Sequence, residues 1–293
     1  MAKKAVKKKF VGTPTSKSSK VSNKSVGTPT STRKKEAPSS VKPGSKGRKT
    51  SKSAGDSSFD RKKNGVMSIR EKAMDLSGDF QGGASAPWNL NGEGFLFPLW
   101  AKKEYNREMG FFTDEDSKQY LGGLGSLMLV NYESSDVGPD YELMYIPGSF
   151  EYKNDSYKRI TRIFVSSQKS VEEGIRNWAI PKEKADFIWT QEGNRTKISV
   201  FRGGKEFFRV TILIKSFFFP VTTKILPHTL LQKSSDGYLR TQFIGKGKGR
   251  IATILEIWSD EAVFPDAIKG GIFRTGIYTN PFELVFPPAN KID

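Results

Sequence analysis

The sequence contains no cysteine and only one histidine, His228, among its 293 residues. Without cysteine there can be no disulfide, no thiolate metal site and no cysteine nucleophile. A single histidine also excludes zinc or iron centres that need several imidazole ligands. We therefore predict neither a metal nor a cofactor, and we interpret His228, which follows Pro227, as a loop residue rather than an acid or base.

Long apolar runs are missing as well. No stretch approaches the roughly twenty apolar residues that a membrane-spanning helix needs. The amino terminus also lacks the apolar core of a secretory signal. We therefore predict a soluble protein without a transmembrane segment, located in the cytoplasm, or in the nucleus or an organelle if its basic tail acts as a targeting signal.

Acidic residues are scarce at the start of the chain. Residues 1–63 hold 19 of the 48 Lys and Arg but only three acids, a net charge of +16, whereas the remainder has a net charge of +1. Large apolar side chains are also rare there, so residues 1–66 should form a disordered Lys/Ser/Thr-rich tail. This tail is either a solvated extension or a segment that attracts nucleic acid or an anionic surface. Its only rings, Phe10 and Phe59, do not support base stacking.

The composition changes after the tail. Residues 67–86 predict a short helix, over 68–76, and a linker. From residue 87 to 293, aromatic and β-branched residues form short runs that are separated by Gly, Pro, Asn and Asp, which is typical of strands. The predicted strands are 95–100, 125–132, 142–146, 160–166, 187–191, 197–202, 206–214, 238–244, 250–258 and 282–286.

Two glycine-rich segments are predicted to be turns. Gly203-Gly204 tolerates the positive φ of a tight hairpin between 197–202 and 206–214. GKGKGR at 245–250 lacks the spacing of a phosphate-binding loop, so we interpret it as a turn between strands 238–244 and 250–258. So many short strands with one or two short helices predict a mainly β domain, either a closed antiparallel barrel or a sandwich.

One short helix is predicted between strands. Ser170 and Glu173 have the spacing of a capping box, so the helix should begin at Ser170. Pro181 lacks an amide hydrogen and disfavours the helical conformation of the residue before it, so the helix should end near Trp178. Lys182 would then lie on an irregular segment just after the helix.

A family signature overlaps this helix. Its matched positions are Ile163, Gly174, Asn177, Trp178, Pro181 and Lys182. Through these residues the chain resembles the acetoacetate decarboxylase superfamily, particularly its fungal-type members, and a weaker resemblance covers residues 87–288. The resemblance implies a closed antiparallel β-barrel whose interior holds a reactive lysine, and it makes a homo-oligomer an expectation.

The resemblance also implies catalytic roles for two residues. Lys182 matches the lysine that forms a Schiff base with a keto substrate, and Glu142, within GPDYELMYIPG at 138–148, matches an active-site glutamate. A lysine amine can attack a carbonyl only after losing its proton, which burial or a nearby cation promotes. Glu142 would position the substrate or move protons.

Three positions differ from the family pattern. Glu183 follows Lys182 where the family has a second lysine. Gly92 aligns with an arginine that holds the substrate carboxylate in the family, and Ile175 replaces the arginine after the signature glycine. We therefore leave the substrate open to keto acids and related carbonyl compounds.

Two functions fit these residues. The first is a decarboxylase-like carbon–carbon lyase that works through Lys182. The second is a non-catalytic barrel that binds a small apolar metabolite. For either function, we expect the small molecule to contact four aromatic residues: Trp178, Phe217, Phe218 and Phe219.

Overall fold

The computed structural model describes residues 83–224 and 229–292. The basic tail, the helix predicted over 68–76 and His228 lie outside the described residues. In the part of the chain that is described, no helix is long and apolar enough to cross a membrane.

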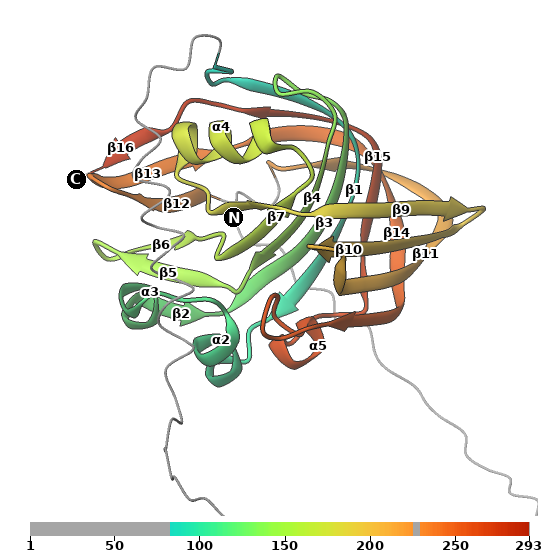
Figure 1. Ribbon diagram of the computed structural model, residues 1–293, viewed down its shortest axis with the longest axis horizontal. Helices are drawn as coiled ribbons and strands as arrows, with labels where there is room; N and C mark the ends of the chain where they lie inside the picture. The colour runs from blue at the N-terminus through green and yellow to red at the C-terminus, as the bar shows by residue number, and fades with distance from the viewer. Residues whose placement is uncertain (1–82, 225–228, 293) are drawn as a thin grey trace, which may run out of the picture. The chain divides into compact units, whose positions relative to one another are not determined.

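Strands dominate the described residues, which confirms the prediction of a mainly β fold. The larger sheet has ten strands, and Figure 1 shows it strongly curled. In order across this sheet, the strands are β8 (Lys182–Lys184), β7 (Arg162–Val165), β4 (Asp140–Ile146), β3 (Leu124–Ser134), β1 (Trp88–Trp100), β15 (Thr275–Phe286), β14 (Ile244–Ser259), β11 (Lys205–Thr222), β10 (Arg195–Arg202) and β9 (Asp186–Glu192).

The curled sheet is antiparallel except at one edge. There β8 pairs in parallel with β7, and Ile163 lies opposite Lys182. Among the described strands, no ladder joins the two end strands β8 and β9. The structure thus shows a half-barrel sheet where the resemblance implied a closed barrel.

A second sheet has six short strands. In order, they are β16 (Asn290–Ile292), β13 (Gly237–Gln242), β12 (Thr229–Ser234), β6 (Asp155–Lys158), β5 (Ser149–Tyr152) and β2 (Tyr120–Gly122). The helices are α2 (Lys103–Met109), α3 (Asp114–Gln119), α4 (Gln168–Trp178) and α5 (Ala267–Gly270), of which only α4 was predicted. The other three are too short to show a helical period of apolar residues.

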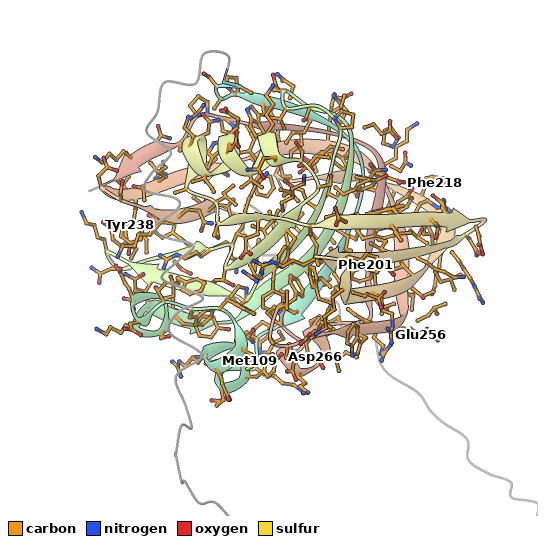
Figure 2. The ribbon with its side chains drawn as sticks, viewed as in Figure 1. Met109, Phe201, Phe218, Tyr238, Glu256 and Asp266 are labelled. Carbon is orange, nitrogen blue, oxygen red and sulfur yellow. The ribbon has the colours of Figure 1, made fainter. Side chains whose placement is uncertain are left out.

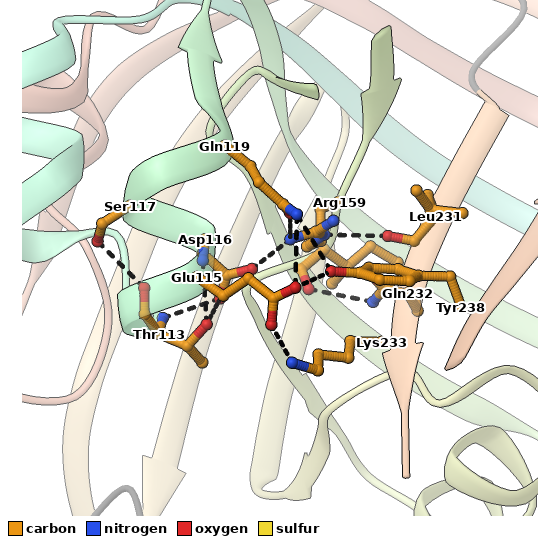
Figure 3. A network of polar contacts seen from close by, with 11 residues as sticks. Thr113, Glu115, Asp116, Ser117, Gln119, Arg159, Leu231, Gln232, Lys233 and Tyr238 are labelled. Atoms are coloured by element: carbon orange, nitrogen blue, oxygen red, sulfur yellow. Dashed lines mark hydrogen bonds and ion pairs between the residues drawn. The ribbon is translucent and has the colours of Figure 1, made fainter. Parts of the chain in front are cut away.

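A polar network fastens α3 to the second sheet (Figure 3). Arg159 forms an ion pair with Asp116, and its Nε donates to the carbonyl oxygen of Leu231 at 3.1 Å. On the same helix, Glu115 accepts hydrogen bonds from Lys233 and from the Tyr238 hydroxyl. These bonds hold the pKa of Glu115 below its usual value, since both stabilise the ionised carboxylate.

The hairpin predicted at Gly203-Gly204 is present. Both glycines have positive φ, and Arg202 pairs with Lys205 across the turn. Along β11 the residues Phe208, Val210, Ile212 and Ile214 are buried, as their alternation predicts. The local rules for turn and strand therefore hold here.

The turn predicted at 245–250 is wrong. These residues lie inside β14, a continuous strand between β11 and β15, where Lys246 pairs with Thr222 and with Glu283. The glycines allow close approach of neighbouring strands: a Cβ on Gly247 would lie 2.7 Å from the Pro281 carbonyl oxygen. Glycine here reflects crowding across the sheet, which the sequence of one strand does not reveal.

The buried apolar residues form two clusters. The larger cluster packs along the inner face of the curled sheet and includes Phe95, Phe164, Phe208 and Phe264. The smaller cluster comprises Trp88, Leu90, Val130, Tyr132, Val137, Ile146, Ile160, Ile163, Val165, Trp178, Ile180 and Leu230. It contains Trp178 and Ile180, which lie four and two residues before the start of β8.

Candidate active site

The site begins with the alternation of side chains along β4. Asp140, Glu142, Met144 and Ile146 are spaced two residues apart, so their side chains share one face of the strand. All four line a single cavity. The exposed fraction of Glu142 is 4%, so this carboxyl group is removed from solvent.

Helix α4 forms another wall, but its start differs from the prediction. The N-cap is Ser167, whose side chain accepts a hydrogen bond from the Ser170 amide. Ser170 lies inside the first turn, and its hydroxyl oxygen accepts a hydrogen bond from Nζ of Lys182 at 2.9 Å. Glu173 does not cap the helix because it lies six residues beyond the N-cap, and its carboxylate instead pairs with Arg176 at 2.7 Å.

The end of α4 agrees with the prediction from Pro181. The helix stops at Trp178, and Ala179 takes a left-handed conformation that turns the chain. Lys182 does not lie on an irregular segment, however; it is the first residue of β8. Parallel pairing with β7 fixes its backbone, and this pairing is not visible in the local sequence.

Lys182 is buried, with an exposed fraction of 6%. Its Nζ donates to Oε1 of Glu142 at 2.6 Å and lies 5.5 Å from the centre of the Trp88 ring. The lysine stem packs against Gly174, where an added Cβ would lie 2.6 Å from Cδ of Lys182. The signature glycine therefore makes room for the lysine.

Two further signature residues attach α4 to neighbouring segments of the chain. The side-chain amide of Asn177 donates to the carbonyl oxygen of Ala84 at 2.9 Å and accepts from the Ala86 amide at 3.3 Å. Trp178 donates to the carbonyl oxygen of Pro287 at 2.8 Å. These bonds tie α4 to the residues that precede β1 and to those that follow β15.

Burial raises the pKa of Glu142, and the negative charge of Asp140 adds to that rise. The positive charge of Lys182 and hydrogen bonds from Lys182 and the Tyr132 hydroxyl act in the opposite direction. The Tyr132 hydroxyl donates to Oε2 at 3.3 Å, and burial raises its own pKa as well. A carboxyl group of raised pKa next to an amine is suited to accept and return a proton.

The cavity between β4, α4 and β8 has a volume of about 60 Å³. It is lined by Trp88, Leu90, Met128, Tyr132, Ser135, Val137, Asp140, Glu142, Met144, Ile146, Ile160, Ile163, Ser170, Trp178, Ile180, Lys182, Leu230, Phe243, Leu284 and Phe286. Most of these side chains are apolar, and Lys182 is the only cationic one among the described residues of the wall.

Of the aromatic residues predicted to contact a small molecule, Trp178 lines this cavity. Phe217 and Phe218 do not, since they are 72% and 58% exposed. Figure 2 shows Phe218 at the outer edge of the curled sheet, and Phe219 on the same strand also lies outside the cavity wall. The ladder between β11 and β14 shifts register between Ile214 and Phe218, which places these residues beyond the buried segment. Their contact with a small molecule stays a prediction.

Two of the positions that differ from the family pattern, Glu183 and Gly92, are explained by their contacts in the structure. Glu183 points away from the cavity and forms ion pairs with Arg162 and Arg202, because neighbouring residues of a strand face opposite sides. Gly92 is crowded by the backbone of Asn131 on β3, so a longer side chain would not fit there. The cavity wall therefore keeps Lys182 but has no arginine among its described residues.

Sequence reasoning missed Ser170, Tyr132 and Asp140 as residues of this site. Asp140 could have been found from its position two residues before Glu142 on a strand. Ser170 could have been found from its four-residue spacing to Gly174, which places both on one helix face. Among the described residues, no group of three His, Cys, Asp or Glu is arranged to hold a metal ion.

A family model described as acetoacetate decarboxylase matches residues 118–220, a segment that includes Glu142, Ser170 and Lys182. No curated protein matches the chain by sequence.

Several solved structures are similar in fold. Acetoacetate decarboxylase from Legionella pneumophila has a TM-score of 0.53 and 14% identity, over 77% of this chain and 95% of that one. An acetoacetate decarboxylase-like enzyme from Sphingomonas wittichii has a TM-score of 0.53 and 10% identity, over 71% and 94%. The enduracididine biosynthesis enzyme MppR, complexed with pyruvate, has a TM-score of 0.52 and 9% identity, over 74% and 93%.

Proposed function

We infer that this chain, a member of the acetoacetate decarboxylase superfamily, is a carbon–carbon lyase that activates a small carbonyl compound as an imine on Lys182. The observation that carries the proposal is the position of Nζ of Lys182, buried in a largely apolar cavity and 2.6 Å from Oε1 of Glu142. Burial protects an imine from early hydrolysis, and the neighbouring carboxylate can take the proton that the amine must lose.

The reaction would begin when Glu142 accepts a proton from Lys182. The neutral amine adds to the carbonyl carbon, and loss of water from the carbinolamine gives an iminium ion on the lysine. The iminium nitrogen then receives the electron pair of a breaking carbon–carbon bond, which leaves an enamine and releases carbon dioxide if the substrate is a β-keto acid. Protonation of the enamine and hydrolysis regenerate Lys182.

Ser170 and Tyr132 would assist the two central groups. The Ser170 hydroxyl oxygen, 2.9 Å from Nζ, holds the amine on the helix side of the cavity. The Tyr132 hydroxyl donates to the glutamate oxygen that does not contact the lysine. The two contacts orient Lys182 and Glu142 toward each other, so that each proton transfer needs little rearrangement.

The substrate is a keto acid or a related carbonyl compound. The complex of MppR with pyruvate supports a small oxo compound in this fold. The absence of an arginine from the described cavity wall favours compounds that do not need an anchor for a carboxylate.

Borohydride trapping tests the proposal. The protein is incubated with acetoacetate, pyruvate or small neutral ketones in the presence of sodium borohydride, and the peptide that contains Lys182 is weighed by mass spectrometry. We expect a reduced adduct on Lys182 in the wild type and none in Lys182→Arg, because a guanidinium stays protonated and is not a nucleophile. Lys184→Arg is the matched control, since Lys184 is exposed on the same strand and should be dispensable.

The apolar wall supports a second candidate, a non-catalytic protein that binds a small apolar metabolite. Trp88 and Trp178 line the cavity, so their fluorescence should report binding. Saturable quenching by a ketone that never yields a trapped adduct would favour this second function and contradict the lyase.

A further inference from the structure

Asp140 is a carboxyl group of the cavity wall that the proposed reaction does not use. It lies two residues before Glu142 on β4 and faces the same cavity. Its exposed fraction is 3%, so solvent does not reach it freely. A buried carboxyl group needs hydrogen-bond partners on both oxygens, and the two oxygens of Asp140 differ in this respect.

Oδ1 of Asp140 has a full set of partners. It accepts from the Ser166 amide at 2.9 Å, from the Ser166 hydroxyl at 2.7 Å and from the Ser167 amide at 2.9 Å. These three bonds attach β4 to the residues that lead into α4. Oδ1 alone therefore makes the hydrogen bonds by which this side chain joins β4 to the start of α4.

Oδ2 of Asp140 has no hydrogen-bond partner among the described residues. Of the buried side-chain atoms that lack a partner there, it is the one that belongs to a residue of the cavity wall. It is a buried acceptor without a donor, on a residue of the same cavity wall as Lys182. A ligand that enters the cavity can supply the missing donor.

The other wall residues limit the chemistry of that ligand. Lys182 is the only cation of the described wall and already pairs with Glu142, so a ligand carboxylate would be buried beside two acidic groups without a cation of its own. A ligand ammonium group would have three N–H donors, but Oδ2 is the only buried side-chain acceptor without a partner on the described wall. A hydroxyl group needs only one acceptor and carries no charge.

We propose that Asp140 is a specificity-determining residue, whose Oδ2 accepts a hydrogen bond from a hydroxyl group of an uncharged hydroxy-ketone or hydroxy-aldehyde while the carbonyl carbon of that compound lies at Lys182. The proposal rests on the lysine chemistry proposed above and names the substrate class. The cavity has a volume of only about 60 Å³, so the substrate is small.

The test compares ligands that differ only in the hydroxyl group. Hydroxyacetone and 4-hydroxy-2-butanone are paired with butanone and 2-pentanone, in which a methyl group replaces the hydroxyl. Binding is measured by the fluorescence of Trp88 and Trp178, and imine formation by borohydride trapping. We expect the wild type to bind at least one hydroxy-ketone about tenfold more tightly than its methyl partner, the usual effect of a hydrogen bond to a charged group.

The matched variant is Asp140→Asn. Its amide oxygen can keep the three bonds from Ser166 and Ser167, while its NH₂ group replaces the acceptor Oδ2 with a donor. We expect the variant to lose the preference for the hydroxy-ketone over butanone. Thermal unfolding followed by circular dichroism checks that the variant is folded.

The outcomes separate this proposal from the lyase proposal. Equal affinity for hydroxy-ketones and their methyl partners in the wild type would overturn the role of Asp140, even if Asp140→Asn did not fold. An unchanged preference in a folded Asp140→Asn variant, or tighter binding of aminoacetone or pyruvate than of hydroxyacetone, would overturn it as well. A preference that depends on Asp140 without any trapped adduct would support the hydroxyl contact and contradict the imine chemistry.

Discussion

Lys182 depends on neighbours from three separate elements. Glu142 comes from β4, Ser170 and Gly174 come from α4, and Trp88 begins β1. Each limits where the amine can lie: Glu142 and Ser170 accept its hydrogen bonds, and Gly174 leaves room for its stem. The reactivity of this lysine is therefore sensitive to changes that do not touch the amine itself.

Gly174→Ala tests the room left for the lysine. The new Cβ would lie 2.6 Å from Cδ and 2.8 Å from Cε of Lys182, so the side chain must move away from Glu142. We expect the rate of borohydride trapping to fall about a hundredfold. The helix should persist, because alanine favours helix by about 1 kcal/mol over glycine.

The control for this change is Lys169→Ala, an exposed position on the same helix. It should trap substrate at the wild-type rate. Trapping by Gly174→Ala at the wild-type rate would show that the amine does not need its observed position.

The raised pKa of Glu142 predicts a dependence of stability on pH. Burial makes the folded-state pKa higher than the unfolded value, so the folded protein binds more protons and is stabilised below the unfolded pKa. That stabilisation is lost as the pH rises through the folded pKa. Because Lys182 lowers the pKa of Glu142, a Lys182→Met variant should show the effect more strongly.

The measurement is urea denaturation of Lys182→Met and of Lys182→Met/Glu142→Gln at a series of pH values above 4.5, the ordinary pKa of glutamate. The free energy of unfolding of the single variant should fall with pH, by at most about 1.4 kcal/mol per pH unit, relative to that of the double variant. Parallel curves for the two variants would mean that Glu142 titrates at its ordinary pKa.

At the scale of single elements, β14 shows how neighbouring strands determine the secondary structure of a segment. GKGKG has the composition of a turn, but β11 and β15 are long enough to pair with it on both sides. Its glycines lie where a Cβ would meet the adjacent chain. Position in the sheet, rather than composition, made this segment a strand.

Gly247→Ala should therefore destabilise the protein. The added methyl group would lie 2.5 Å from the Thr279 methyl and 2.7 Å from the carbonyl oxygen of Pro281, and we expect a loss of about 1–3 kcal/mol in the free energy of unfolding. Lys248→Ala, at the exposed neighbouring position, should change it by less than about 0.5 kcal/mol. Equal stability of the two variants in urea denaturation would argue for a turn.

At the scale of the whole molecule, the excess of positive charge and the residues proposed to react lie in different parts of the chain. The first 63 residues have a net charge of +16 and the remainder +1. The residues proposed to react lie between positions 132 and 182, within the nearly neutral part. Attraction to polyanions and imine chemistry should thus be independent of each other.

Deletion of residues 1–66 tests this separation. We expect the shortened protein to form the Lys182 adduct at the wild-type rate, and to lose any salt-dependent binding to DNA that the full chain shows. Binding is measured by fluorescence anisotropy at several salt concentrations. Salt-dependent binding that survives the deletion would place the polyanion site in the remainder of the chain.

The sequence by itself determined the features that depend on neighbours in the chain. Pro181 ends α4 because proline removes an amide hydrogen and restricts the preceding residue. Gly203-Gly204 forms a turn because both residues take positive φ without strain. The alternation from Phe208 to Ile214 identified a half-buried strand because side chains of a strand face alternate sides.

Only the tertiary structure decided the features that depend on residues distant in the chain. It brought Glu142 to 2.6 Å from Lys182, turned Glu183 toward Arg162, and placed Phe217 and Phe218 in solvent. It made Ser167 rather than Ser170 the N-cap of α4, so the Ser170 hydroxyl oxygen can accept a hydrogen bond from Nζ of Lys182. The physical reason is that pairing between β7 and β8 and the packing of α4 set the surroundings of Lys182, and the ladder between β11 and β14 sets those of Phe217 and Phe218. None of these contacts follows from local conformational preference.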